Sequence, residues 1–290
     1  MTPRTGDLAI LSRSPQLSTR NGIAYRRFGE GPPLILLHGS SGSWTHWVRN
    51  IGALSRLRTV FALDLPGFGA SGDVPPDISV DAYVEIVAAA LAQMSNDDEP
   101  IDVVGFSFGG VIAAGVAALL RERLRRLSLL TPSGFSRPTG RKLELPRRKD
   151  FGTADGGRRA FHRAMLSTVM LAQKESIDEQ AIDIQASNVE RSRFDGSHIS
   201  WSGRLLGYLG LIDRPIQLIY GERDPMPFPS AAARAAACRA VKPTIRLDWV
   251  EGAGHWLQYE RAPAVNRLLA DFLGAIKQDQ TVERGLGYAI

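Results

Sequence analysis

The chain has 290 residues, 44% of them hydrophobic and 22% charged, a composition typical of one large globular domain or of one domain with an insertion. Its net charge is +5, but the 35 basic and 30 acidic residues are interspersed, which argues against a nucleic-acid partner. One cysteine, Cys238, excludes an internal disulfide framework, and its place in an alanine-rich run predicts a small packed side chain.

Residues 1–20 contain no long apolar run, so we expect neither a signal peptide nor a membrane anchor, and we predict a cytoplasmic location. The histidines lack metal-ligand spacing and no nucleotide-binding motif is present, which predicts no metal and no cofactor. The expected partner is a small-molecule substrate. The sequence carries no signal for an oligomeric state.

Short apolar runs alternate with longer helical patterns, which is typical of a mostly parallel sheet flanked by helices. The predicted buried strands are Leu34–Leu37, Val60–Leu63, Ile101–Val104, Leu127–Leu130, Ile216–Tyr220 and Thr244–Val250, with Ile23–Phe28 as an antiparallel edge strand. The predicted helices between them are Trp44–Ser55, Val80–Met94, Phe108–Leu120, Pro229–Ala240 and Pro263–Ile276.

The stretch from Pro132 to about Gly210 interrupts this alternation, because it is rich in arginine, has helical segments and lacks a convincing strand. We therefore predict a core domain from residues 1–131 and 211–290, with residues 132–210 inserted as a helical cap. The polar tail Lys277–Ile290 is expected to be loosely ordered.

The sequence Gly105-Phe106-Ser107-Phe108-Gly109-Gly110 lies between a predicted strand and a predicted helix. A serine at such a sharp turn lies in strained backbone, and flanking glycines remove side chains that would collide there. The turn lifts the hydroxyl above the sheet, at the positive end of the following helix. This context predicts Ser107 as a nucleophile.

A serine hydroxyl needs a base, and the base needs a carboxylate that holds its tautomer. His255 follows the last predicted strand, and Asp224 follows the strand Ile216–Tyr220, so both reach the carboxyl edge of the sheet, where chemistry collects in open α/β sheets. Glu222 is a possible substitute for Asp224, and Asp248 within a strand is a weaker one.

Negative charge that develops on the substrate oxygen needs preorganised donors. One predicted donor is the backbone amide of Phe108, next to the nucleophile. The other is the amide of Ser40, in the loop His38-Gly39-Ser40-Ser41-Gly42, where the glycines permit close approach and His38 is expected to brace the loop.

These residues resemble the α/β-hydrolase superfamily in His38-Gly39, in Asp64-Leu65-Pro66-Gly67-Phe68-Gly69, in the elbow Gly105–Gly110, in Gly221–Asp224 and in Gly254-His255-Trp256. The resemblance implies an α/β-hydrolase fold, with a mostly parallel eight-stranded sheet flanked by helices and a helical cap insertion. It also implies the triad order Ser107, Asp224, His255.

Serine at the elbow, in place of aspartate, favours acyl transfer over the epoxide hydrolase and haloalkane dehalogenase chemistry of the superfamily. We predict a hydrolase of a small, partly apolar carboxylic ester, with Trp44, Phe106 and Trp256 as candidate pocket walls. Phe108 is another candidate wall. Any of these rings could equally be a core residue.

The segment Gly254–Glu260 resembles the histidine loop of the meta-cleavage-product hydrolases, which makes carbon–carbon bond hydrolysis the second prediction. Arg191 or Arg193 would then bind a substrate carboxylate. Phe106 departs from that pattern, because those enzymes usually carry a polar residue before the serine. Perhydrolase or lyase chemistry on the same triad, and a non-catalytic ligand-binding protein on the same fold, are further alternatives.

Overall fold

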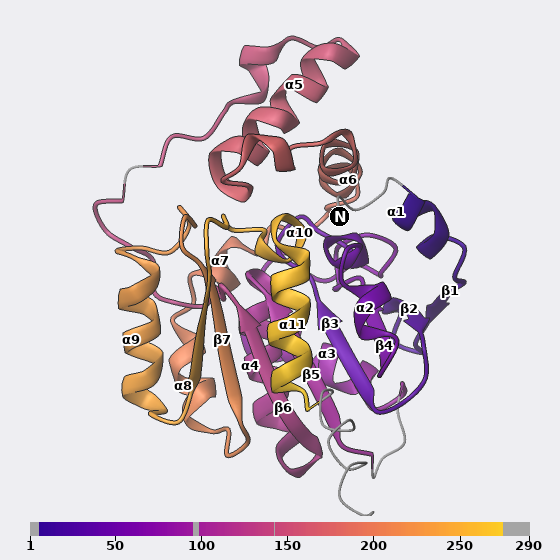
Figure 1. Cartoon of the computed structure of the whole chain (residues 1–290), viewed down its shortest axis with the longest axis vertical. Coiled ribbons are helices and arrows are strands. Elements are labelled where there is room, and N and C mark those ends of the chain that lie inside the picture. The colour runs from indigo at the N-terminus through magenta and orange to yellow at the C-terminus, as the bar shows by residue number, and fades with distance from the viewer. Residues whose placement is uncertain (1–5, 95–98, 142, 275–290) are drawn as a thin grey trace, which may run out of the picture.

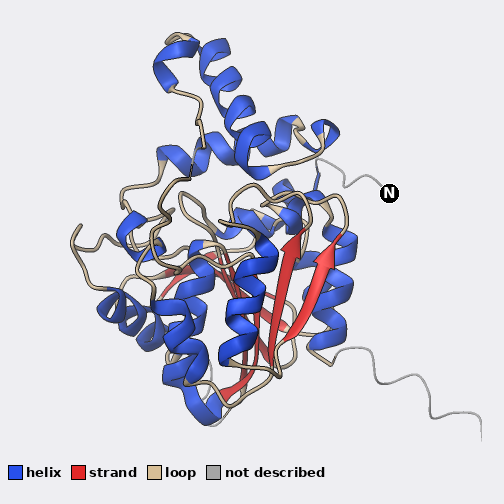
Figure 2. Ribbon diagram, turned by 90° about the vertical axis from the view of Figure 1, so that its left-hand side faces the viewer, coloured by secondary structure: helices blue, strands red, loops and turns tan. Residues whose placement is uncertain are grey.

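The computed structural model describes residues 6–94, 99–141 and 143–274, which build one eight-stranded sheet with helices on both faces (Figure 1 and Figure 2). The strand order is β1-β2-β4-β3-β5-β6-β7-β8. β1 and β2 pair antiparallel, as do β2 and β4, and the remaining pairs are parallel. The expected fold class is thereby confirmed. The tail Lys277–Ile290 lies outside the described residues.

The strands are β1 (Gln16–Ser18), β2 (Ala24–Phe28), β3 (Pro33–Leu37), β4 (Thr59–Leu63), β5 (Ile101–Phe106), β6 (Leu124–Leu130), β7 (Ile216–Gly221) and β8 (Arg246–Val250). The α-helices are α1 (Gly6–Leu11), α2 (Ile51–Leu54), α3 (Val80–Leu91), α4 (Phe108–Leu120), α5 (Asp155–Met165), α6 (Glu179–Glu190), α7 (Ser197–Ser200), α8 (Arg204–Gly210), α9 (Ala231–Val241), α10 (Leu257–Glu260) and α11 (Ala262–Phe272). Short helical turns are η1 (Trp44–Trp47), η2 (Arg121–Arg123), η3 (Arg148–Phe151), the π-helical η4 (Leu166–Met170) and η5 (Lys174–Ser176).

Alternate side chains of the strands pack on opposite faces of the sheet and form two hydrophobic cores. Ile35 and Leu37 of β3 belong to the core that includes residues of α3, α4, α8 and α9. Leu34 and Leu36 belong to the core that includes residues of α2 and α11. Because both faces are covered, β3 is apolar throughout and the other central strands are largely apolar, as is usual for parallel sheets.

The predicted helix Trp44–Ser55 is wrong, because the segment forms η1 and α2 with a break between them. Asn50 lies at the break, and its buried side-chain amide donates to Gln258 O (3.0 Å) and to Asn266 Oδ1 (2.7 Å). These hydrogen bonds to α10 and α11 hold the chain at Asn50 between the two helical turns. β1 was not predicted, because it is short and exposed and therefore has no apolar pattern.

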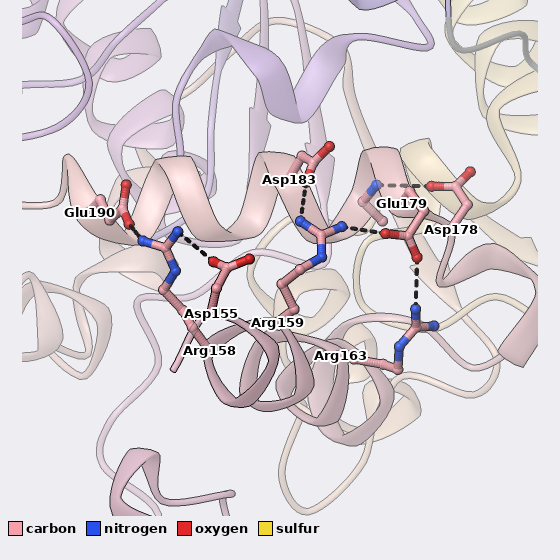
Figure 3. Close-up of polar contacts among 9 residues, drawn as sticks. Asp155, Arg158, Arg159, Arg163, Asp178, Glu179, Asp183 and Glu190 are labelled. Atoms are coloured by element: carbon pink, nitrogen blue, oxygen red, sulfur yellow. Dashed lines mark hydrogen bonds and ion pairs between the residues drawn. The ribbon is translucent and has the colours of Figure 1, made fainter. Parts of the chain in front are cut away.

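The part of the cap that contains α5 and α6 stands above the sheet (Figure 1). Figure 3 shows ion pairs between the two helices, among them Arg159 with Asp183 (2.6 Å) and Arg163 with Glu179 (2.8 Å). These side chains are exposed, so such pairs contribute little stability, and the apolar contacts of Leu166 with the core below hold the cap more firmly. Helices α7 and α8, within residues 132–210, pack against α4.

Candidate active site

Ser107 occupies the turn between β5 and α4 with φ 51° and ψ −112°, in a region of backbone space that non-glycine residues rarely adopt. A side chain on Gly105 would collide with the carbonyl oxygen of Gly109, and one on Gly109 with that of His38. The two glycines are therefore required for the turn to close against the neighbouring backbone. Ser107 itself remains partly accessible to solvent.

Three side chains from three separate strand ends form one hydrogen-bonded line. Ser107 Oγ lies 2.9 Å from His255 Nε2, and His255 Nδ1 lies 2.8 Å from Asp224 Oδ2. The His255 side chain is 7% exposed and the Asp224 side chain is fully buried. In this arrangement Nδ1–H donates to the carboxylate and Nε2 is left to accept the serine proton. The structure thus brings together the three residues predicted as the triad.

Burial alone would raise the pKa of the Asp224 carboxyl, but the charge and hydrogen bond of His255 and two further donors lower it below its ordinary value. The further donors are the hydroxyl of Thr131 and the backbone amide of Met226, at 2.8 Å from Oδ1. Asp224 is therefore ionised, and it is oriented on both oxygens. Glu222 is exposed, and its carboxylate accepts from the amide of Gly252 at 3.3 Å.

The loop predicted to supply an oxyanion donor is held by two buried histidines. His38 Nδ1 donates to Gly39 O (2.7 Å), while its Nε2 accepts from the amide of Leu65 (2.8 Å). The amide of Gly39 donates to His46 Nδ1 at 3.3 Å. The amides of Ser40 and Phe108 have no acceptor among the residues that the structure describes, so both are free to bind a substrate oxygen.

The aromatic rings predicted as pocket walls are core residues. Trp256 is fully buried, stacks on Tyr259 with 4.2 Å between ring centroids, and donates from its indole to His46 O. Phe106 and Phe108 are also buried, and Trp44 packs against Phe28. Trp256, Phe106 and Phe108 thus have almost no accessible surface in this structure, which agrees with the core alternative, and their role as pocket walls stays a prediction.

The two cap arginines have different environments. Arg193 is engaged with the core, since Nε pairs with Asp73 at 2.6 Å and Nη1 donates to Gly69 O at 3.0 Å. Arg191 is exposed, and its guanidinium forms no hydrogen bond or ion pair within the described ranges. Of these two arginines, only Arg191 therefore has a guanidinium free to bind a substrate group.

Thr131 and His46 are site residues that the sequence analysis missed. Thr131 follows β6, which pairs with β7, so the strand order would have placed it beside Asp224. His46 lies in η1, and no motif in the sequence indicates its contact with Gly39. Cys238 is buried and unpaired, and burial raises the pKa of its thiol to about 12, which agrees with a packed side chain.

Residues 6–94, 99–141 and 143–274 contain no cluster of three or more His, Cys, Asp or Glu side chains that could hold a metal ion. Within the same ranges, every helix is too short or too polar to span a bilayer.

Comparison with known proteins gives one family and several relatives. A model described as the alpha/beta hydrolase family matches residues 34–268. The dihydrolipoyllysine-residue acetyltransferase component of the acetoin cleaving system from Pseudomonas putida is 28% identical over 281 residues, covering 90% of this chain and 69% of that protein.

A 2-hydroxymuconate semialdehyde hydrolase from Pseudomonas sp. strain CF600 is 37% identical over 113 residues, covering 38% of this chain and 40% of that protein. This chain therefore matches less than half the length of that relative. The solved structure of naproxen esterase from Bacillus subtilis superimposes with a TM-score of 0.70 at 22% identity, covering 92% of this chain and 94% of that one. At that identity the likeness concerns the fold alone.

Proposed function

This chain belongs to the alpha/beta hydrolase family, and from that premise we propose that it is a serine hydrolase that cleaves a small carboxylic ester through an acyl-enzyme. The observation that carries the proposal is the hydrogen-bonded line from Ser107 through His255 to Asp224. A binding protein has no need of a base aimed at a strained serine. Because the aromatic rings lie in the core, they no longer argue for an apolar substrate.

In the proposed acylation, Ser107 Oγ attacks the ester carbonyl while His255 Nε2 takes its proton. Asp224, ionised and held by three donors, stabilises the imidazolium that forms. The amides of Ser40 and Phe108 bind the oxygen that becomes negative. His255 then gives the proton to the leaving alcohol.

In deacylation, His255 takes a proton from a water molecule, which attacks the acyl carbon and releases the acid. The proton returns to Ser107, so the protein is unchanged at the end of the cycle. No step requires a metal ion or an organic cofactor. The same triad can activate nucleophiles other than water in the second step. Which leaving groups are possible depends on which substrates the cap allows to reach Ser107.

The test is intact-mass analysis after reaction with a serine-directed fluorophosphonate, followed by turnover of short-chain p-nitrophenyl esters. We expect one adduct on the native chain, none on Ser107→Ala, and ester turnover that Ser107→Ala lacks. Circular dichroism of the variant checks that its fold is retained. A Ser107→Ala variant that still hydrolysed esters at near-native rates would refute the assignment of the nucleophile.

Hydrolysis of a carbon–carbon bond is the second candidate, favoured by the likeness to 2-hydroxymuconate semialdehyde hydrolase. Arg191, with its free guanidinium, would then bind a carboxylate of the substrate. Fluorophosphonate labelling without ester turnover, together with cleavage of a vinylogous diketone, would favour this candidate. A folded protein that fails to react with the fluorophosphonate would instead favour a non-catalytic binding protein.

A further inference from the structure

The loop that carries His255 is packed directly against the cap segment 170–173. The amide of Trp256 donates to Met170 O at 2.7 Å, and the side-chain amide of Gln173 donates to Gly252 O at 2.9 Å. A Cβ on Gly254 would lie 2.8 Å from the nitrogen of Ala172 and 2.9 Å from Met170 O. The two segments therefore meet backbone to backbone, on both sides of His255.

Glu260, the last residue of α10, joins the two segments through one carboxylate. Its Oε2 accepts from the amide of Gly254 at 2.6 Å, and its Oε1 accepts from the amide of Gln173 at 2.6 Å. Glu260 is only 9% exposed, and no lysine, arginine or histidine forms an ion pair with it in the part of the chain that the structure describes. Figure 1 shows α10 at the end of the core that faces the cap.

A carboxylate is the side chain that suits this place. Two buried amides from two segments need two acceptors, and hydrogen bonds to a charged acceptor are about twice as strong as those between neutral groups. A glutamine of the same shape supplies one acceptor oxygen, and its NH₂ group would face an amide N–H. Glutamine can therefore satisfy the amide of Gly254 or that of Gln173, but not both.

We propose that Glu260 is a positioning residue that couples the seating of the cap to the alignment of His255. When segment 170–173 is in place, Gln173 holds one oxygen of Glu260, and the other oxygen fixes the amide of Gly254, which directly precedes His255. When the cap lifts, the anchor of the histidine loop is lost. The acyl chemistry of the site is then available only beneath a seated cap. This inference rests on the proposed function for its kinetic part.

The first test compares Glu260→Gln with Glu251→Gln, a matched control because Glu251 is an exposed carboxylate just before the same loop. We expect Glu260→Gln to lower kcat for a p-nitrophenyl ester by about 10- to 100-fold with KM within about twofold, and Glu251→Gln to leave both unchanged. An unchanged kcat in Glu260→Gln, with only Tm lowered, would show a purely structural role and overturn the proposal.

The second test substitutes Gln173, the cap residue whose amide binds Glu260. Gln173→Pro removes the amide that binds Glu260, whereas Gln173→Ala keeps that amide and loses only the side-chain contact. We expect a loss of kcat in Gln173→Pro that is not additive with Glu260→Gln, and a much smaller loss in Gln173→Ala. Additive losses would mean that the two residues act separately, against the proposal.

A third measurement does not depend on ester turnover. The Nδ1 proton of His255, bonded to Asp224, is expected to give a downfield proton NMR signal. This signal should broaden or shift in Glu260→Gln and stay unchanged in Glu251→Gln. If the native protein hydrolyses no ester, the proposed function fails while this signal still tests the coupling. An identical signal in the native protein and in Glu260→Gln would refute the coupling between the cap and His255.

Discussion

His38 should make the stability of this protein fall in mild acid. Both ring nitrogens are bonded, with Nδ1 donating to Gly39 O and Nε2 accepting from the amide of Leu65. A second proton would place an N–H against the N–H of Leu65. Complete burial lowers the pKa of His38 from its ordinary 6.5 to about 4, although the bond to Gly39 O acts in the opposite direction.

The sign and the size of the effect follow from these two values. Because the pKa in the folded state is lower than in the unfolded state, His38 contributes its full stability above about pH 6.5 and loses it as the pH falls toward 4. The loss amounts to about 3 kcal/mol at pH 4, and about 2 kcal/mol of it is already reached at pH 5. His46, whose pKa is also lowered by burial, adds to the slope.

Urea unfolding at pH 7 and at pH 5 measures the difference for the native chain and for His38→Gln, in which glutamine can still accept from Leu65. We expect the free energy of unfolding of the native chain to fall by about 2 kcal/mol more than that of the variant. His198→Gln, at an exposed position, should retain the native dependence on pH. Equal dependence in the native chain and in His38→Gln would refute the reasoning.

Three further substitutions test the hydrogen bond to Asp224, the turn at Ser107 and helix α5. Thr131→Val removes a hydroxyl bonded to the buried carboxylate of Asp224, so kcat for an ester should fall about 10- to 100-fold, while Thr59→Val, at the start of β4, should leave it unchanged. Gly109→Ala would place a methyl group against the backbone oxygens of His38 and Leu37. Thermal unfolding should therefore show that the free energy of unfolding is lowered by more than about 3 kcal/mol. Gly156→Ala, in open space on α5, should raise the free energy of unfolding by about 0.4–1 kcal/mol.

The strands and the three residues of the hydrogen-bonded line could be predicted because two constraints act together. A strand buried on both faces must be a short apolar run, so β3, β5 and β7 were visible in the sequence. The carboxyl ends of parallel strands share one edge of the sheet, so residues that follow such strands are close in space. Ser107, Asp224 and His255 each follow a strand, and local sequence was enough to bring them together.

Side-chain direction was not predictable in the same way. Trp256 lies next to His255 in the sequence, and a pocket wall was a reasonable expectation from that position alone. Its indole instead turns to the carbonyl of His46 and its ring to Tyr259, two contacts that depend on how η1 and α10 pack. Thr131 also follows a strand at the same edge of the sheet, but no motif in its local sequence indicates that its hydroxyl is bonded to Asp224.

If the chain is the hydrolase that we propose, the same distinction predicts that the cap determines substrate specificity. The ends of the strands place Ser107, His255 and Asp224, and the turn around Ser107 leaves no room for a side chain on Gly105 or Gly109. The cap contacts the histidine loop largely through the backbone of residues 170–173. These backbone contacts do not depend on which side chains line the inner surface of the cap. Substitutions there can change which substrate enters while Glu260 keeps His255 aligned, so the chemistry and the choice of substrate can vary independently.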